Sequence, residues 1–258
     1  MTLWVGTSWK MNKTLSQATE FITELGSFEA QHQVDRGNAW PGVQPFVIPS
    51  FTALATVRAQ LPSSSSVLLG AQNAHWEDAG AFTGEISVPQ AMDAGAQIIE
   101  IGHSERREHF GETDHTVNLK VKSIVRNGLI PLLCVGEPLS VLQSGQSVAY
   151  VVNQVRKALA GVTDTSRVLI AYEPIWAIGA GGQEPNGDEV AAVIDALQHE
   201  FGDAVAGILY GGSVNARNAT PLLGIAGING LFIGRSAWDV SGYLDILHQA
   251  TQAQKALA

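Results

Sequence analysis

The feature that most constrains the fold of this chain is a repeated alternation between short apolar runs and longer amphipathic segments. Eight runs of strand length recur along the 258 residues, at 3–6, 46–48, 67–69, 98–101, 130–135, 168–171, 207–210 and 231–233. Several of them are apolar at consecutive positions, which is typical of parallel strands that are buried on both faces. Eight strand–helix units without a linker-like stretch favour a closed (β/α)8 barrel over an open sheet, and we expect residues 1–258 to form one domain.

The segments between these runs show the spacing of amphipathic helices. One stripe comprises Val148, Val151, Val155 and Leu159, and a second comprises Val190, Val193, Ile194, Leu197 and Phe201. Helix start signals accompany them: Ser87 and Gln90 have the spacing of a capping box, and Asn186 precedes Asp188 and Glu189 in a first turn. Each apolar run is therefore predicted to be a strand that is followed by a helix.

Charge and composition exclude several classes of partner. Fifteen Lys and Arg residues against 24 Asp and Glu residues give a net charge of −9, which argues against nucleic acid or an anionic membrane surface as a partner. No apolar run reaches the roughly 18 residues that a membrane span needs. The single cysteine, Cys134, has no partner for an internal disulfide, and the N-terminal residues lack the regions of a signal peptide. We expect a cytoplasmic protein.

Three polar residues follow predicted strands, at the end of a barrel where active sites lie. Lys10 follows the first strand, His103 the fourth and Glu173 the sixth. Burial would raise the pKa of Glu173 towards that of a useful base, although a carboxylate paired with a cation at the barrel rim is the more ordinary interpretation. Lys10 would supply a fixed positive charge for a phosphate or an oxyanion, unless its side chain only extends to solvent.

The histidines indicate acid–base chemistry better than they indicate a metal site. His103 stands where a strand gives way to a helix, and the positive end of the helix dipole would keep its imidazole neutral. The plainer alternative is a capping or core histidine. His103, His109 and His115 are six residues apart, which matches neither a common zinc spacing nor one face of a helix, so no metal is expected.

Glycine-rich strings follow the last two predicted strands. Residues 211–213 read Gly-Gly-Ser, and Gly234 follows the eighth strand, at positions where barrels commonly hold phosphate with backbone N–H groups. Ordinary turns are the alternative. Residues 176–182, flanked by Pro174 and Pro185, resemble a hinged lid, or else an exposed loop. There is no GxxxxGK[ST] motif and no GxGxxG in a strand–helix context, so nucleotide binding gains no support.

Taken together, these strings resemble the triosephosphate isomerase family, whose fold is the TIM barrel. The matching stretches extend along nearly the whole chain, at residues 9–12, 71–73, 80–85, 101–107, 134–137, 171–179 and 210–214. Several ordered motifs at the spacing of one family are far more specific than any single motif.

The resemblance implies a role for individual residues. Glu173 would move a proton between neighbouring carbons, neutral His103 would move protons on the two oxygens of an enediol, and Lys10, supported by Glu105, would stabilise the enediolate. The phosphate of a small sugar would be held around Gly179, Ser213 and Gly234, together with Arg235. The family needs no cofactor. The loop that contains Thr83 would insert into a second subunit, which implies a homodimer.

The chain departs from the common family pattern at three places. Ser8 stands where Asn is usual, the segment 179–185 lacks its usual Lys, and Arg235 follows Gly234 where a second Gly is usual. Residues 6–14, 230–238 and 242–247 are similar to the L-erythrulose-1-phosphate isomerases within the family. The resemblance implies conversion of L-erythrulose 1-phosphate to D-erythrulose 4-phosphate, with the smaller Ser8 making room for one more carbon. The alternatives are triosephosphate isomerisation and, more remotely, a non-catalytic binding barrel.

Overall fold

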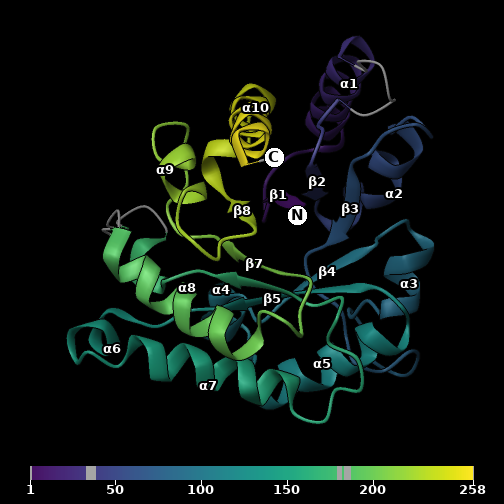
Figure 1. Cartoon of the computed structure of the whole chain (residues 1–258). Coiled ribbons are helices and arrows are strands. Elements are labelled where there is room, and N and C mark those ends of the chain that lie inside the picture. Colours follow the sequence, from purple (N-terminus) through teal and green to yellow (C-terminus); the bar gives the residue numbers. More distant parts are fainter. Residues whose placement is uncertain (1, 33–38, 179–181, 183–186, 258) are drawn as a thin grey trace.

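Eight parallel strands form a closed barrel in which sequence order is also spatial order, and the eighth strand pairs with the first (Figure 1). The computed structural model describes residues 2–32, 39–178, 182 and 187–257. The strands are β1 (Leu3–Ser8), β2 (Val43–Ile48), β3 (Leu68–Ala71), β4 (Ile98–Ile101), β5 (Ile130–Val135), β6 (Leu169–Tyr172), β7 (Gly207–Tyr210) and β8 (Gly230–Ile233). The predicted (β/α)8 barrel is confirmed, whereas the assignment of residues 1–258 to one domain stays a prediction.

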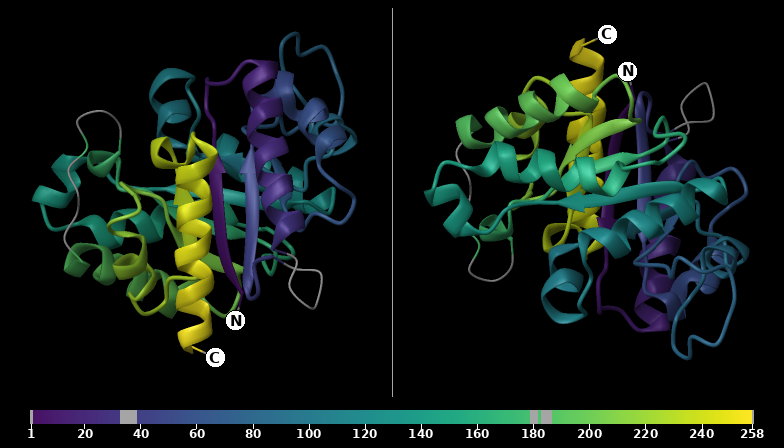
Figure 2. Two further views of the ribbon diagram at one scale, coloured as in Figure 1. Left: turned by 90° about the horizontal axis from the view of Figure 1, so that it is seen from above. Right: turned by 90° about the horizontal axis from the view of Figure 1, so that it is seen from below.

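The helices surround the barrel (Figures 1 and 2). The α-helices are α1 (Leu15–Gln31), α2 (Phe51–Gln60), α3 (Val88–Asp93), α4 (Ser104–His109), α5 (Asp114–Arg126), α6 (Leu139–Gln143), α7 (Ser147–Leu159), α8 (Gly187–Phe201), α9 (Ala219–Leu223) and α10 (Val240–Leu257). Two 3-10 turns, η1 (Ile175–Ala177) and η2 (Arg235–Ala237), follow β6 and β8. Helix α10 lies along β1 and β2, where the Tyr243 hydroxyl contacts the carbonyl oxygens of Val5 at 2.9 Å and Phe46 at 3.1 Å.

The strands are buried on both faces, as their consecutive apolar residues predict. Their outward side chains pack under the helices in the larger core, which includes Val5, Ile99 and Ile170. Their inward side chains fill the barrel with a second core, which comprises Phe46, Ile48, Ile98, Ile130, Leu132, Cys134, Leu169, Ala171, Leu209 and Phe232. The barrel interior is therefore a packed layer that closes the lower end of any pocket at its mouth.

The predicted helical stripes are confirmed in one case and partly wrong in the other. All five residues of the α8 stripe are buried. In α7, Val151 and Val155 are buried, but Val148 is 38% exposed and Val152 is buried in its place. Val148 is the second residue of α7, and the buried face of the helix begins only at Val151.

The helix starts that the sequence predicts agree with the structure where it describes them. The Ser87 hydroxyl accepts from the backbone N–H of Gln90, whose side chain accepts from the backbone N–H of Ser87, so the capping box is confirmed. Asp188 and Glu189 lie in the first turn of α8, as expected, whereas Asn186 is outside the described residues.

Candidate active site

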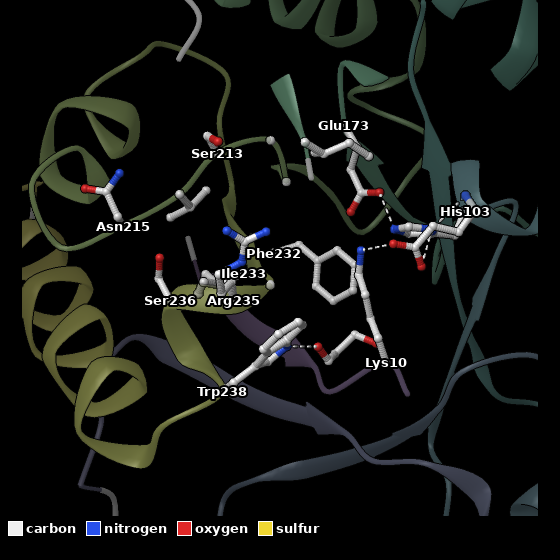
Figure 3. A pocket seen from close by; sticks show the side chains of 17 residues that line it. Lys10, His103, Glu173, Ser213, Asn215, Phe232, Ile233, Arg235, Ser236 and Trp238 are labelled. Atoms are coloured by element: carbon white, nitrogen blue, oxygen red, sulfur yellow. Dashed lines mark hydrogen bonds and ion pairs between the residues drawn. The ribbon is translucent and has the colours of Figure 1, made fainter. Parts of the chain in front are cut away.

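A pocket of about 240 Å³ opens at the C-terminal mouth of the barrel (Figure 3). Its lining comes from the ends of five strands, and it comprises Ser8, Lys10, His103, Glu105, Glu173, Ile178, Gly211, Gly212, Ser213, Val214, Asn215, Phe232, Ile233, Gly234, Arg235, Ser236 and Trp238. Every predicted site residue that the structure describes therefore lines this one pocket. Gly179 lies outside the described residues. The size is suited to a small molecule.

Lys10 follows β1 in a backbone conformation that few side chains adopt. Its φ is +51°, in the left-handed region, and the Gln72 side chain donates to its carbonyl oxygen at 2.8 Å. Its Nζ lies 2.7 Å from Oε1 of Glu105. Burial lowers the pKa of Lys10, but the hydrogen bond to Glu105 and the negative charges of Glu173 and Glu105 outweigh burial and raise it. Lys10 therefore keeps a positive charge at neutral pH.

His103 stands at the start of α4, as the sequence predicts, and it is also the N-cap of that helix, which was the plainer alternative; it is almost fully buried. Its Nδ1 accepts from the backbone N–H of Glu105 at 3.2 Å, which leaves the proton of the neutral ring on Nε2. Burial, and after it the positive charge of Lys10, lowers the pKa of His103 to about 4. The imidazole is neutral, as expected, but burial is the main cause, where the sequence argument relied on the helix dipole.

Glu173 directly follows β6, and its side chain points towards His103 in Figure 3. Its Oε2 lies 3.3 Å from Nε2 of His103. A Cβ on Gly211 would lie 2.7 Å from the Cγ of Glu173, so this glycine leaves room for the carboxyl group. Burial raises the pKa of Glu173 well above its ordinary value, against the opposing positive charge of Lys10. Such a carboxylate is a strong base once it is ionised.

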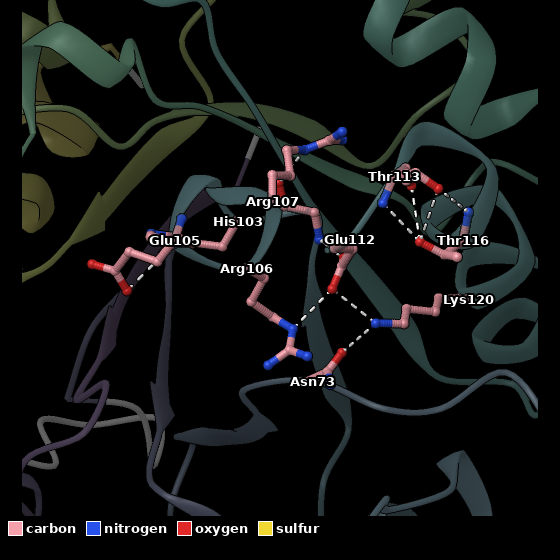
Figure 4. Close-up of polar contacts among 10 residues, drawn as sticks. Asn73, His103, Glu105, Arg106, Arg107, Glu112, Thr113, Thr116 and Lys120 are labelled. Atoms are coloured by element: carbon pink, nitrogen blue, oxygen red, sulfur yellow. Dashed lines mark hydrogen bonds and ion pairs between the residues drawn. The ribbon is translucent and has the colours of Figure 1, made fainter. Parts of the chain in front are cut away.

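A buried ion network holds the strand end that carries His103 (Figure 4). The Glu112 carboxylate accepts from the backbone N–H of Gly102 at 2.7 Å and from Arg106 and Lys120 at 2.8 Å each. Lys120 also donates to the side-chain oxygen of Asn73 at 2.8 Å. These contacts tie the start of α4 to α5 and to the segment after β3. Sequence reasoning missed Glu112 and Lys120, although Lys120 stands on the apolar side of α5 among buried residues.

A second set of contacts holds the segment after Glu173. The fully buried Glu137 accepts from the Tyr172 hydroxyl at 3.2 Å and from Nε1 of Trp176 at 2.9 Å. Both donors flank Glu173 in sequence. Glu137 therefore fixes the backbone on either side of the carboxylate, a role that the sequence analysis did not assign.

The residues with a predicted role in phosphate binding lie at the ends of β7 and β8. The Ser213 hydroxyl donates to the carbonyl oxygen of Ala177 at 2.8 Å, so this side chain is engaged within the protein although Ser213 lines the pocket. An added Cβ on Gly234 would meet no atom within 4 Å, so the space beside it is open to the pocket. Arg235, in η2, is exposed and lines the same space. Figure 3 shows Ser213 and Asn215 on the opposite side of the pocket from His103.

Ser8 lies at the floor of the pocket and is nearly fully buried. Its carbonyl oxygen accepts from Nε1 of Trp238 at 3.0 Å, a contact that joins the end of β1 to the segment after β8. Its Oγ has no hydrogen-bond partner of ordinary geometry among the residues that the structure describes. The backbone of Ser8 is therefore held in place, and its hydroxyl is buried near Glu100, whose pKa it lowers.

Glu100 is a further polar residue near the site that the sequence analysis missed. It lies in β4, is 4% exposed, and has a pKa that burial raises from 4.5 to about 7, against the lowering effects of the Ser8 hydroxyl and the Lys10 charge. The signal was available, because a charged residue inside an apolar strand is unusual.

No helix in the described part of the chain is long and apolar enough to cross a membrane. Within the same residues, no group of three or more His, Cys, Asp and Glu side chains is placed to hold a metal ion.

A closed (β/α)8 barrel whose mouth brings together Lys10, His103 and Glu173 has the architecture that the sequence motifs imply. A sequence model of the triosephosphate isomerase family matches residues 3–250, so the chain belongs to that family. It is 55% identical to the L-erythrulose-1-phosphate isomerase of Mycolicibacterium smegmatis, over 99% of this chain and 96% of the relative. It is 50% identical to the protein of that name from Mesorhizobium japonicum and 49% identical to the one from Brucella abortus, each over 97% of this chain and 98% of the relative.

The buried carboxyl of Glu100 predicts a pH-dependent stability. The pKa of Glu100 is higher in the folded protein than its ordinary value of 4.5. Its contribution to the free energy of unfolding is therefore complete below about pH 4.5 and is lost as the pH rises through about 7. The neutral Glu100→Gln variant should escape this loss. Relative to the wild type, its free energy of unfolding should increase between these pH values by about 3 kcal/mol, as a shift of this size implies. Urea unfolding at several pH values measures the difference.

The exposed Glu24→Gln variant, on α1, is the control for removal of a charge. A stability difference between Glu100→Gln and wild type that stays constant with pH would contradict the assigned protonation of Glu100.

Proposed function

We propose that this protein isomerises a small phosphorylated sugar through an enediolate, with Glu173 as the base. The observation that carries the proposal is the convergence of Glu173 and neutral His103, whose Oε2 and Nε2 atoms are 3.3 Å apart at the floor of one pocket. Glu173 takes a proton from the carbon that bears a hydroxyl and returns it to the neighbouring carbonyl carbon. The carbonyl and hydroxyl exchange places, and no oxidant or reductant is consumed.

His103 and Lys10 act on the oxygens in this proposal. The proton on Nε2 of His103 can be donated to one substrate oxygen and recovered from the other, and the low pKa keeps the ring neutral between transfers. The Lys10 ammonium group supplies a fixed positive charge for the enediolate, and Glu105 holds its Nζ at 2.7 Å. The charges are in place before the reaction starts, which avoids reorganisation during it.

We assign phosphate binding to the loops after β6, β7 and β8. The open space beside Gly234 and the engaged hydroxyl of Ser213 support a cradle of backbone N–H groups, and Arg235 adds a positive charge. Gly179 belongs to the same proposal on the resemblance alone. In this arrangement the phosphate lies at one side of the pocket and the reacting carbons lie between His103 and Glu173.

The substrate that we propose is L-erythrulose 1-phosphate, which yields D-erythrulose 4-phosphate. The names of the three relatives at 49–55% identity support this choice over the triose phosphates. Removal of the proton on C3 gives a C2–C3 enediolate, and return of the proton to C2 leaves the carbonyl on C3. Numbered from the other end, the product is erythrulose 4-phosphate. The buried Ser8 at the pocket floor leaves more space than an asparagine would.

Cytoplasmic location and a homodimer complete the proposal. A phosphorylated sugar is charged and does not cross a lipid bilayer unaided, so its isomerase is expected where the substrate is made. Thr83 is exposed in the loop between β3 and α3, beside Phe82, which is 43% exposed. Met11 is 98% exposed in the loop after β1. In the proposed dimer, the partner subunit would cover these apolar side chains.

Glu173→Gln should lower kcat by at least about a thousandfold, because an amide cannot accept the carbon-bound proton. His103→Gln should also be strongly impaired. The matched control is Glu108→Gln, an exposed glutamate on α4, which should keep wild-type activity. Steady-state kinetics measures the turnover of each variant, and circular dichroism shows whether it is folded. Near-normal turnover by a folded Glu173→Gln variant would remove Glu173 as the base.

The wild-type enzyme should have a higher kcat/KM for L-erythrulose 1-phosphate than for glyceraldehyde 3-phosphate. Some triose activity should remain, because one missing carbon group in a pocket costs only about 1–3 kcal/mol. Ser8→Asn should shift the preference towards the triose by crowding the fourth carbon. Both substrates are assayed on both proteins under the same conditions. A hundredfold preference of the wild type for the triose would point instead to a triosephosphate isomerase.

Sedimentation should show a species of twice the chain mass of 27.3 kDa. Thr83→Arg should shift the equilibrium towards monomers, because a long charged side chain would be buried at the proposed interface. Thr163→Arg, in the exposed loop after α7, is the control and should leave the mass unchanged. A wild type that sediments as a monomer at micromolar concentration would refute the dimer.

A further inference from the structure

A small cavity lies at the ends of β4, β5 and β6, beside the active-site pocket. Its volume of about 10 Å³ is close to the least that one water molecule occupies. Among the described residues, Glu173 alone lines both this cavity and the pocket that holds Lys10 and His103. The proposed base therefore borders two spaces, one for the substrate and one the size of a single water molecule.

The wall of the cavity contacts the carboxyl group of Glu173. Cys134 belongs to this wall. Burial raises the pKa of the Glu173 carboxyl group, and a hydrogen bond from the Cys134 thiol is one of the effects that lower it. Gly136 belongs to the same wall, and a Cβ at this position would overlap the carbonyl oxygen of Glu173, so only glycine lets the chain after β5 run this close to it. Glu173 is thus adjacent to the cavity through both its carboxyl group and its backbone.

Arg107, in α4, also lines the cavity and carries a buried donor without a protein partner. Its Nε donates to the carbonyl oxygen of Gly102 at 2.8 Å and its Nη1 donates to Asp114 at 2.7 Å, so the plane of the guanidinium group is fixed. Its Nη2 has no hydrogen-bond partner among the described residues. An unpaired buried donor is costly, and polar cavities hold water where apolar ones stay dry. Nη2 and the cavity together make a site for one water molecule.

The cavity borders a groove on the outer surface of the barrel. The groove has a volume of about 630 Å³, and its lining, which is mainly polar and charged, comes largely from α4, α5 and α7. Gln154 is held at its inner end, because its Oε1 accepts from the backbone N–H of Gly136 at 2.9 Å. The described residues that line both the groove and the cavity are Ser104, Arg107, Gln154 and Ile175. These four side chains therefore separate the cavity from bulk water.

The substrate covers the other side of Glu173 during the reaction. While a sugar phosphate fills the pocket of about 240 Å³, it shields the proton that Glu173 has taken from carbon from water at the mouth of the barrel. A proton on a carboxyl group exchanges with a water molecule that hydrogen-bonds to it. The cavity offers a place for such a water molecule on a side that the substrate leaves open.

We propose that the cavity binds a water molecule that exchanges the proton on Glu173 with bulk water through the groove between α4 and α7. The water molecule accepts from Nη2 of Arg107, takes the substrate-derived proton from the protonated carboxyl group and returns one of its own protons, so the charge of the site does not change. Exchange with water in the groove, past Ser104 and Gln154, then carries the original proton away. This inference rests on the proposed function and adds to it the route by which the product acquires hydrogen from solvent.

The test follows a deuterium atom on C3 of L-erythrulose 1-phosphate, in ordinary water and at low conversion. Direct transfer by Glu173 retains the deuterium in the product, whereas exchange on Glu173 replaces it by hydrogen, and mass spectrometry measures both. Gln154→Leu and Ser104→Leu each place an apolar side chain between the cavity and the groove. In each variant, the ratio of retained to replaced deuterium should rise at least about threefold, because the barrier to exchange is higher. The kcat should change by less than about twofold, because this exchange is not a step of the isomerisation.

The ratio of retained to replaced deuterium is the decisive quantity, because it does not depend on the fraction of folded enzyme. Asn153→Leu is the matched control: Asn153 lines the groove but not the cavity, so the ratio should stay at the wild-type value. A crystal structure of the wild type adds a readout that needs no turnover. It should show an ordered water molecule within hydrogen-bond distance of Nη2 of Arg107.

A ratio that is unchanged in both Gln154→Leu and Ser104→Leu would overturn the inference. Complete retention of deuterium by the wild type, an equal rise in Asn153→Leu, or a cavity without ordered water would overturn it as well. A wild type that turns over only glyceraldehyde 3-phosphate would refute the proposed substrate, and deuterium on C2 of that triose then serves the same test. A wild type that isomerises neither compound would refute the proposed function, which is a different result from an unchanged ratio in an active enzyme.

Discussion

Closure of the eight-stranded barrel is the constraint on which the rest of the structure depends. Because β8 pairs with β1, no strand has a free edge, and residues that are distant in sequence, such as Ser8 and Phe232, line one pocket. The same closure buries both faces of each strand, so any charged group at the mouth stands on an apolar floor. The pKa shifts of His103 and Glu173 follow mainly from that burial.

Burial favours the neutral form of Lys10, and the hydrogen bond to Glu105 is the largest of the effects that oppose it. Glu105 is half exposed, yet it holds Nζ of Lys10 at 2.7 Å and its backbone N–H selects the tautomer of His103. A single residue thus sets the charge of one neighbour and the proton position of another. Its exposure matters, because a solvated carboxylate stays ionised and keeps Lys10 positive without a large desolvation penalty. The site therefore combines buried groups that react with a solvated group that organises them.

The sequence predicts the fold and the main site residues because both have local signatures. Consecutive apolar residues predict β5 and β6, and polar residues directly after the strands predict Lys10 and Glu173. Contacts between distant segments have no such signature. Lys120 donates to Asn73, which is 47 residues away in sequence, and no pattern around either residue predicts that contact.

Single apolar or charged residues can also mislead. The exposed Val148 shows that helical spacing does not reveal at which residue the buried face of a helix begins. Glu100 was missed because it lies inside an otherwise apolar run, all of which was assigned to a buried strand. Its neighbours include Ser8 and Lys10 at the end of β1, which no local pattern around Glu100 reveals.

The contact between Trp238 and Ser8 has a consequence for how the protein is made. Ser8 and Lys10 leave the ribosome among the first residues, and β2 supports β1 on one side early, but the contacts on its other side come last: β8, the indole of Trp238 and the hydroxyl of Tyr243. The nascent chain, which folds as it emerges, cannot complete this end of the barrel until almost all of it has been translated. A polypeptide truncated before Trp238 would carry every acid and base of the site and still lack the geometry to use them.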